Sequence, residues 1–411
     1  MIDSTVIKSV WEHFSLFHEP TKGYTKLWDI LCDEQEHRSG ITDALEHIRL
    51  IDQKTNGVLT ELGYGYCFDP ALWAHAREAK YQARALELVG EWCVYHPNEG
   101  PLLTNIVVRT LFSIGYTYLP PRIIFHKGIS FLMFPHAYEE AIHSIVALFL
   151  ETYSQSKTST IWDTLVAAES NKLPCPPEEA PAAFRWLVGR MLVSGRAEHD
   201  LRCRKETVDR LDALCAEQDW FSPAFKYQQY KPEPFETVIT NSIIDFAIAH
   251  EVGHIFSHKN GEGTMESDAD FKGFLLFATS WGWRDERLEG CPFSSPIRTI
   301  LGPIWFLFTA ILLLKLRECL EKKLLTLSPK HEGVYLSPAL EGEMKLLEAR
   351  NTALSHQVEE YLGMCIGRGA SFSEEELAFI GGQEHAQQRL LSLMEDWVES
   401  IPASSLRAAS A

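Results

Sequence analysis

NSIIDFAIAHEVGHIFSHK, residues 241–259, is the stretch of sequence on which the fold depends most. Four apolar residues recur along it at helical spacing: Ile244, Ile248, Val252 and Ile255. A stripe of apolar side chains on one face of an α-helix packs against neighbouring elements. The stretch therefore predicts a packed helix, with Thr240 or Asn241 as its expected N-cap.

This predicted helix carries the motif HEVGH, residues 250–254. Side chains four residues apart lie on the same face of a helix, so His250 and His254 can bind one cation. Glu251 lies beside them, turned by about 100° around the helix axis. A catalytic zinc ion typically takes three protein ligands and keeps its fourth position for water. A third ligand is therefore expected from elsewhere in the chain.

A second motif, ESDAD, begins at Glu266 and ends at Asp270. These two acidic residues are again four apart, so they share one face of a second predicted helix. Gly261 and Gly263 suit a tight reversal between the two helices, and Thr264 is the expected N-cap of the second. The two motifs therefore predict a helical hairpin that brings metal ligands together.

HExxH followed by ExxxD, here HEVGH and ESDAD, resembles the glutamate-ligated zinc metallopeptidases, or gluzincins. The resemblance covers residues 241–270. It points to intracellular members with a Glu-x-x-Ala-Asp ending, and to the phage-exclusion peptidases of the Lit type. It implies a zincin-like core that hydrolyses peptide bonds in a protein or peptide substrate.

Carried over residue by residue, the resemblance implies one Zn²⁺ ion bound by His250, His254 and Glu266. Glu251 is then the general base, which takes a proton from a zinc-activated water. Asp270 is the implied carboxylate that holds the other ring nitrogen of His250 and so orients the ligand.

The chain departs from the family pattern in the connection between the two motifs. Only eleven residues separate His254 from Glu266, fewer than many gluzincins carry. The identity of the third ligand therefore stays open. The alternative third ligands are His258, Glu262 and Asp268. The metzincin pattern is excluded, because Ser257 and Asn260 stand where it requires glycine and histidine.

Two other functions stay open from the sequence. A metal ion could hold helices together in a non-catalytic sensor or adaptor. A structural site needs ligands but no base, so Glu251 weighs against that function. The same zinc chemistry could also hydrolyse a non-peptide amide.

For two further parts of an active site, the oxyanion-stabilising donor and the substrate-binding strand, the sequence offers candidates without deciding among them. Stabilisation of the oxyanion needs an additional hydrogen-bond donor. The candidates for that donor are His331, Tyr335, Arg350 and His356. A substrate peptide commonly pairs with an exposed strand, for which the candidate is residues 129–134. The alternative for this strand is simple packing within a small sheet.

The remaining sequence predicts an α+β fold that is predominantly helical. Residues 122–126 and 129–134 form a predicted hairpin around a short glycine-containing turn. From residue 183 almost to the end the periodicity is helical, with breaks near residues 222–234, 261–263, 290–296 and 326–338. We predict an N-terminal helical region, residues 1–95, and a zincin-like metallopeptidase domain with a C-terminal helical part, residues 96–411.

The composition is typical of a folded protein, and its net charge disfavours binding to polyanions. The 411 residues carry a formal charge of -18, which repels nucleic acid, so no nucleic-acid partner is expected. Nine cysteines without a CxxC pair indicate free thiols in a reducing compartment. Charged residues within the first 12 positions break up any secretory signal. A cytoplasmic protein is expected.

One apolar stretch, residues 299–314, contains no charged side chain. It is shorter than the roughly 20 residues that a membrane-spanning helix needs, and Gly302 and Pro303 shorten its regular part further. We expect a buried core helix here, with contact to a membrane as the alternative left open.

Overall fold

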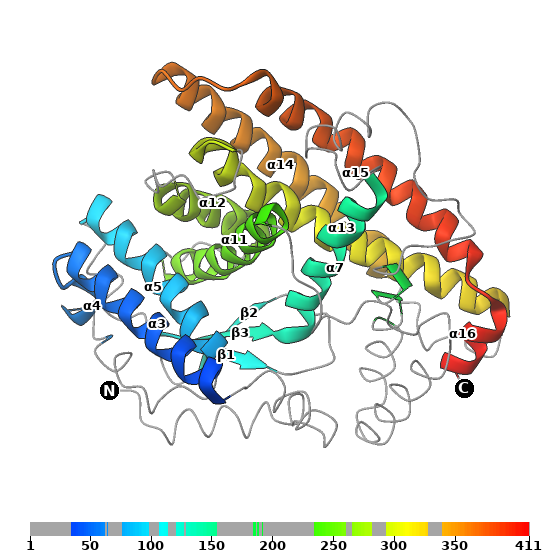
Figure 1. The fold of residues 1–411 in the computed structure, drawn as a ribbon, viewed down its shortest axis with the longest axis horizontal. Helices are drawn as coiled ribbons and strands as arrows, with labels where there is room; N and C mark the ends of the chain where they lie inside the picture. Colours follow the sequence, from blue (N-terminus) through cyan, green and yellow to red (C-terminus); the bar gives the residue numbers. More distant parts are fainter. Residues whose placement is uncertain are drawn as a thin grey trace. The chain divides into compact units, whose positions relative to one another are not determined.

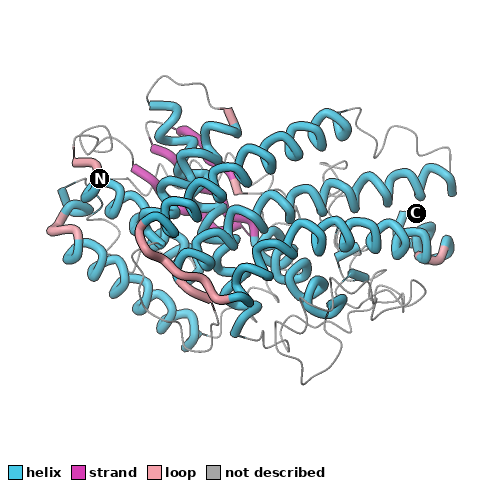
Figure 2. The backbone as a smooth tube through the Cα atoms, turned by 90° about the horizontal axis from the view of Figure 1, so that it is seen from above, coloured by secondary structure: helices cyan, strands magenta, loops and turns pink. Residues whose placement is uncertain are grey.

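The protein is described from a computed structural model. The described residues are 34–61, 64, 76–97, 107–113, 121–126, 129–153, 184–185, 187–188, 191, 234–259, 265–281, 293–327 and 339–410. Helix dominates this part of the chain, and its strands gather in one small sheet, as Figure 2 shows. The predicted class, predominantly helical with a small β-sheet, is therefore confirmed.

The contacts of the chain divide it into two compact units. The first unit takes its residues from Met1–Gly115, Leu119–Tyr138 and Ile244–Glu286. The second takes them from Tyr116–Tyr118, Glu139–Ile243 and Arg287–Ala411. Both predicted metal motifs lie in the first unit. This partition describes packing only, so the predicted division between residues 95 and 96 stays a prediction.

Helix α5 (Ala76–Tyr95) is the central helix of the first unit. It packs against α3 (Glu34–Lys54), α4 (Val58–Glu61), β1 (Val107–Ser113) and α12 (Glu266–Trp281). Figure 1 shows α3 and α5 side by side, in blue and cyan. Gly90 lies close to α3: a Cβ there would lie 3.4 Å from a methyl carbon of Ile51, and 3.3 Å from a methyl carbon of Thr55 just after the helix.

A mixed three-stranded sheet completes the scaffold of the first unit. Its strands are β1 (Val107–Ser113), β2 (Arg122–His126) and β3 (Ile129–Pro135), in the order β1-β3-β2. β3 pairs antiparallel with β2 and parallel with β1. The predicted hairpin of β2 and β3 is confirmed.

The position of β3 corrects one prediction about the substrate. The apolar run from Phe131 to Phe134 is buried, as in a strand that is covered on both faces. Because β3 has a partner strand along each edge, residues 129–134 have no free edge for a peptide. Among the described strands, the two outer strands, β1 and β2, each have one edge without a partner strand.

Two helices carry the predicted metal motifs. α11 (Pro234–Lys259) begins well before the predicted N-cap, so Thr240 is buried inside the helix and does not cap it. The correct start signal is Pro234, since proline favours the first turn, where its missing N–H costs nothing. α12 (Glu266–Trp281) begins at the predicted residue. The connection, including Thr264, lies outside the described residues.

The second unit contains the long C-terminal helices. α13 (Ser295–Leu327) packs against α14 (Ala339–Gly367), α15 (Glu374–Ser400) and α16 (Ala403–Ser410). Most of α7 (His136–Tyr153) belongs to the same unit. The rings of Trp305 in α13 and Phe149 in α7 meet edge to face, with centroids 4.8 Å apart. This contact places aromatic side chains in the core of the unit.

α13 contains the uncharged stretch at residues 299–314. It continues through Pro303, so the prediction that Gly302 and Pro303 shorten the helix is wrong. Among the described helices, it alone is long and apolar enough to cross a membrane. However, 78% of its most apolar window is buried against other parts of the protein. That burial favours the predicted core helix over a span.

A helix boundary between α14 and α15 was not predicted. α14 ends at Gly367, and Gly369 adopts a φ of 92°, a left-handed conformation that suits glycine. Ser373 and Glu376 then form a capping box at the start of α15. Glu376 also accepts a hydrogen bond of 2.6 Å from the backbone N–H of Ser294, just before α13.

Candidate metal centre

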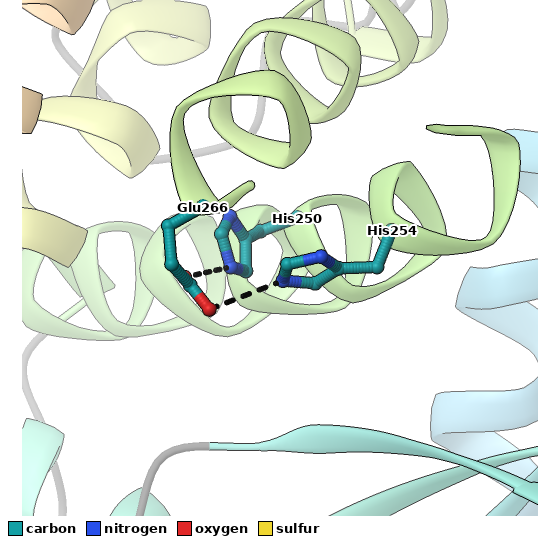
Figure 3. Close-up of side chains that lie close together, drawn as sticks. All are labelled: His250, His254 and Glu266. Carbon is teal, nitrogen blue, oxygen red and sulfur yellow. Dashed lines mark ion pairs between the residues drawn. The ribbon is translucent and has the colours of Figure 1, made fainter. Parts of the chain in front are cut away.

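The two histidines of HEVGH lie side by side on α11 (Figure 3). Their ring centroids are 4.8 Å apart and the ring planes are nearly perpendicular, at 83°. His250 is buried, and the His254 side chain is 12% exposed. The spacing of four residues therefore produces the shared face that the sequence predicts.

Glu266, the first residue of α12, reaches both histidines (Figure 3). One carboxylate oxygen lies 3.2 Å from Nε2 of His250, and the other lies 3.5 Å from Nε2 of His254. Two ligands of a tetrahedral zinc ion are about 3.4 Å apart when their bonds to the metal are about 2.1 Å long. The separations in the protein are close to that value.

His250, His254 and Glu266 form a group that could hold a metal ion, with all ligand atoms within 4.8 Å of one another. Two imidazole nitrogens and one carboxylate oxygen are a donor set of catalytic zinc sites. The same set also serves iron in non-haem oxygenases. The residues therefore fit a transition metal such as zinc.

Asp270 lies on the other side of the His250 ring. Its Oδ1 is 2.9 Å from Nδ1 of His250, and both side chains are buried. At this distance Nδ1–H of His250 can donate a hydrogen bond to the carboxylate of Asp270. The position of Asp270 matches the role that the resemblance implies, because a carboxylate at Nδ1 leaves Nε2 of His250 turned toward Glu266.

The two carboxylates set the proton affinity of His250. Burial lowers its pKa, but contacts at hydrogen-bonding distance with Asp270 and Glu266, and the charge of Glu251, raise it to about 9. This value reflects the protein groups alone. A bound cation repels the proton, so it would lower the pKa.

Glu251 is a buried carboxyl group beside the metal group. Its Oε1 lies 3.9 Å from Nε2 of His250. Burial raises the pKa of Glu251 to about 7, although His250 and His254 oppose the rise and so does a hydrogen bond from the backbone N–H of Ile123 in β2. An N–H that donates to Glu251 points away from β3. Glu251 therefore lies beside the edge of β2 that has no partner strand among the described residues.

A partly buried ion pair links α5 to α11. Nε of Arg84 lies 3.3 Å from Oδ1 of Asp245, and Nη1 lies 2.9 Å from Oε2 of Glu87. Burial lowers the pKa of Arg84, but the two carboxylates outweigh it and raise the pKa above its usual range. Asp245 precedes His250 by five residues, so the pair anchors the helix near the metal group. Sequence reasoning missed it, because the partners are far apart in the chain.

The other candidates from the sequence have mixed outcomes. Asp268 lies on α12 but is not a member of the metal-binding group found among the described residues. The side chains of His258 and Glu262 lie outside the described part of the chain, as do His331 and Tyr335. Arg350 and His356 lie on α14 in the second unit, and their predicted role stays untested.

Comparison with models of known protein families, with curated proteins and with solved structures found no match. The residues of this site are therefore the basis on which a function is inferred.

Proposed function

We propose that this chain is a zinc-dependent metallopeptidase of the gluzincin type, with His250, His254 and Glu266 as ligands of one Zn²⁺ ion. The observation that carries the proposal is the buried carboxyl group of Glu251 beside these ligands. Burying a carboxyl group costs free energy, and a site that only stabilises the fold gains nothing from it. A hydrolase needs this group as its base.

Each residue has a proposed task in the reaction. When bound, zinc would activate a water molecule and polarise the carbonyl group under attack. Glu251 takes a proton from the attacking water and delivers it to the leaving amine, for which a carboxyl pKa not far below the working pH is suited. Asp270 keeps the proton of His250 on Nδ1, so that Nε2 is the ligand atom.

The proposed substrate is an extended segment of a peptide or protein. Main-chain groups on a free strand edge can pair with such a segment, in any sequence context. Glu251 lies beside the free edge of β2 through the N–H of Ile123, which supports binding on that strand in place of the one predicted from the sequence.

The proposed setting is the cytoplasm, without a nucleic-acid partner. Three described cysteines, Cys93, Cys319 and Cys365, are free thiols, which supports a reducing compartment. The net charge of -18 supports the absence of a polyanionic partner.

Two alternatives differ from the proposal in what they require: Glu251 separates the first of them, and the strand edge separates the second. A metal-stabilised sensor or adaptor needs the three ligands only. A hydrolase of a non-peptide amide needs Glu251 as well, but it needs no strand edge for its substrate. The exposed side chain of Glu266 also suits a site that admits a substrate from solvent.

The decisive experiment measures zinc content and peptide cleavage in three variants of the full chain. Glu251→Gln is expected to retain zinc and lose cleavage of a mixed peptide library, whereas His254→Ala is expected to lose both. Glu360→Gln is the matched control, because this carboxylate is exposed on α14. If Glu251→Gln retains zinc and full activity, the peptidase proposal is wrong. Stoichiometric iron in place of zinc would also overturn it.

A further inference from the structure

α11 and α12 approach each other unusually closely at two glycines. A Cβ atom on Gly273 would lie 2.8 Å from Cα and 2.9 Å from N of His250. A Cβ atom on Gly253 would lie 2.6 Å from the carbonyl oxygen of Ala269 and 3.0 Å from N of Gly273. Each glycine therefore faces the backbone of the other helix.

These contacts leave no room for any side chain at either position. Non-bonded carbon atoms are most stable about 3.5–4.0 Å apart, so a methyl group on Gly273 requires a separation larger by roughly 1 Å. The atoms in its way are backbone atoms, which cannot rotate aside as the end of a side chain can. The whole of α12 would have to move.

The crossing lies next to the metal ligands. Glu266, Asp270 and Gly273 follow one another at spacings of four and three residues, so they share one face of α12. Gly273 lies directly against the backbone of His250, and Gly253 is adjacent to His254 in the chain. The separation of the helices at the glycines thus determines how far Glu266 and Asp270 are from the histidines.

We propose that Gly253 and Gly273 are positioning residues of the metal centre, which hold α12 at the one distance from α11 where Glu266 reaches both histidines and Asp270 reaches His250. This proposal rests on the metal site of the proposed function. An outward shift of roughly 1 Å would lengthen the contacts of 3.2 Å and 3.5 Å beyond the spacing of tetrahedral ligands.

The test compares Gly273→Ala with the wild type in the full chain, by competition for zinc with a chelator. We expect Gly273→Ala to bind zinc at least about tenfold more weakly, as when a ligand loses its support. The absorption spectrum of bound Co²⁺ is expected to change also, because it reports the coordination geometry. Circular dichroism checks that the helices persist.

Two controls separate positioning from general destabilisation. Gly363→Ala lies in α14, where an added Cβ meets no atom within 4 Å, and is expected to leave zinc affinity unchanged. Ile48→Ala removes a buried side chain from α3 in the same unit, a helix that packs against α5 and α4. It is expected to destabilise the fold while its folded form retains wild-type zinc affinity and the wild-type Co²⁺ spectrum.

A further variant decides the outcome if Gly273→Ala does not fold. Glu266→Asp shortens the half-exposed ligand by one methylene group, which withdraws the carboxylate without disturbing the core. An affinity loss of at least about tenfold in this variant shows that zinc binding depends on the reach of Glu266, which the proposal requires. Wild-type zinc affinity in a folded Gly273→Ala, or in Glu266→Asp, overturns it. If the wild type itself binds no zinc, the proposed function has failed, which is a distinguishable result.

Discussion

Replacement of Asp270 tests how much a residue outside the proposed ligand set contributes to zinc affinity. Its carboxylate lies 2.9 Å from Nδ1 of His250, and both groups are buried. Asp270→Asn retains the shape and an acceptor oxygen but removes the charge. Asp270→Ala removes the acceptor as well. The two substitutions therefore divide the interaction into a charge contribution and a contact contribution.

The expected magnitudes follow from the nature of this contact. A hydrogen bond to a charged group contributes about 1.5–3 kcal/mol, and a neutral one contributes about 0.5–1.5 kcal/mol. The difference of roughly 1 to 1.5 kcal/mol predicts that Asp270→Asn binds zinc about five- to tenfold more weakly. Loss of a partner that orients a ligand histidine typically costs about 10- to 100-fold, which is the range expected for Asp270→Ala.

The assay is a zinc titration in competition with a chelator at neutral pH. Asp268→Asn is the matched control, because it removes the same charge from the same turn of α12, two residues away and outside the metal-binding group. The reasoning is refuted if Asp270→Ala binds zinc as tightly as the wild type. It is also refuted if Asp268→Asn weakens binding as much as Asp270→Asn, because the charge of the helix would then be the cause.

Two further predictions concern pH and stability. In protein freed of metal with a chelator, zinc must displace a proton from His250, whose pKa is about 9, so zinc affinity is expected to rise with pH up to that value. Because the folded pKa of His250 is raised above its ordinary value of 6.5, its contribution to stability without metal is fully present below that value. This contribution is lost as the pH rises through about 9, and thermal unfolding with a chelator measures the loss. Arg84→Leu leaves the buried carboxylate of Asp245 without its cation and is expected to destabilise the fold by about 3–5 kcal/mol in urea unfolding. The double variant with Asp245→Leu should recover part of this loss, and an additive result would contradict the pairing.

The features that could be predicted from sequence are those with local patterns. The spacing of four between His250 and His254, and again between Glu266 and Asp270, follows from helix geometry alone. These residues therefore come together once the two helices pack. The hairpin of β2 and β3 is also local, because its apolar runs and its turn are contiguous in the chain.

The features that could not be predicted depend on contacts between distant segments. β1 pairs with β3, which does not follow it directly in the chain. The residue pattern within β1 does not indicate which strand it pairs with. The edge of β2 became the candidate for substrate binding only when β3 proved to be central. Gly273 carried one local signal, a glycine inside a helix, but the backbone that it faces could be identified only from the packed structure.

The ligands differ in their access to solvent in a way that bears on metal exchange. The exposed fraction of the side chain rises from 3% for His250 through 12% for His254 to 45% for Glu266. An incoming ion can therefore contact the flexible carboxylate while it is still partly hydrated, and reach the imidazoles afterwards. A bound ion would leave the site in the reverse order. Chelators would then strip the site by first taking over the position of Glu266, so the rate of metal loss should depend on that residue more than on either histidine.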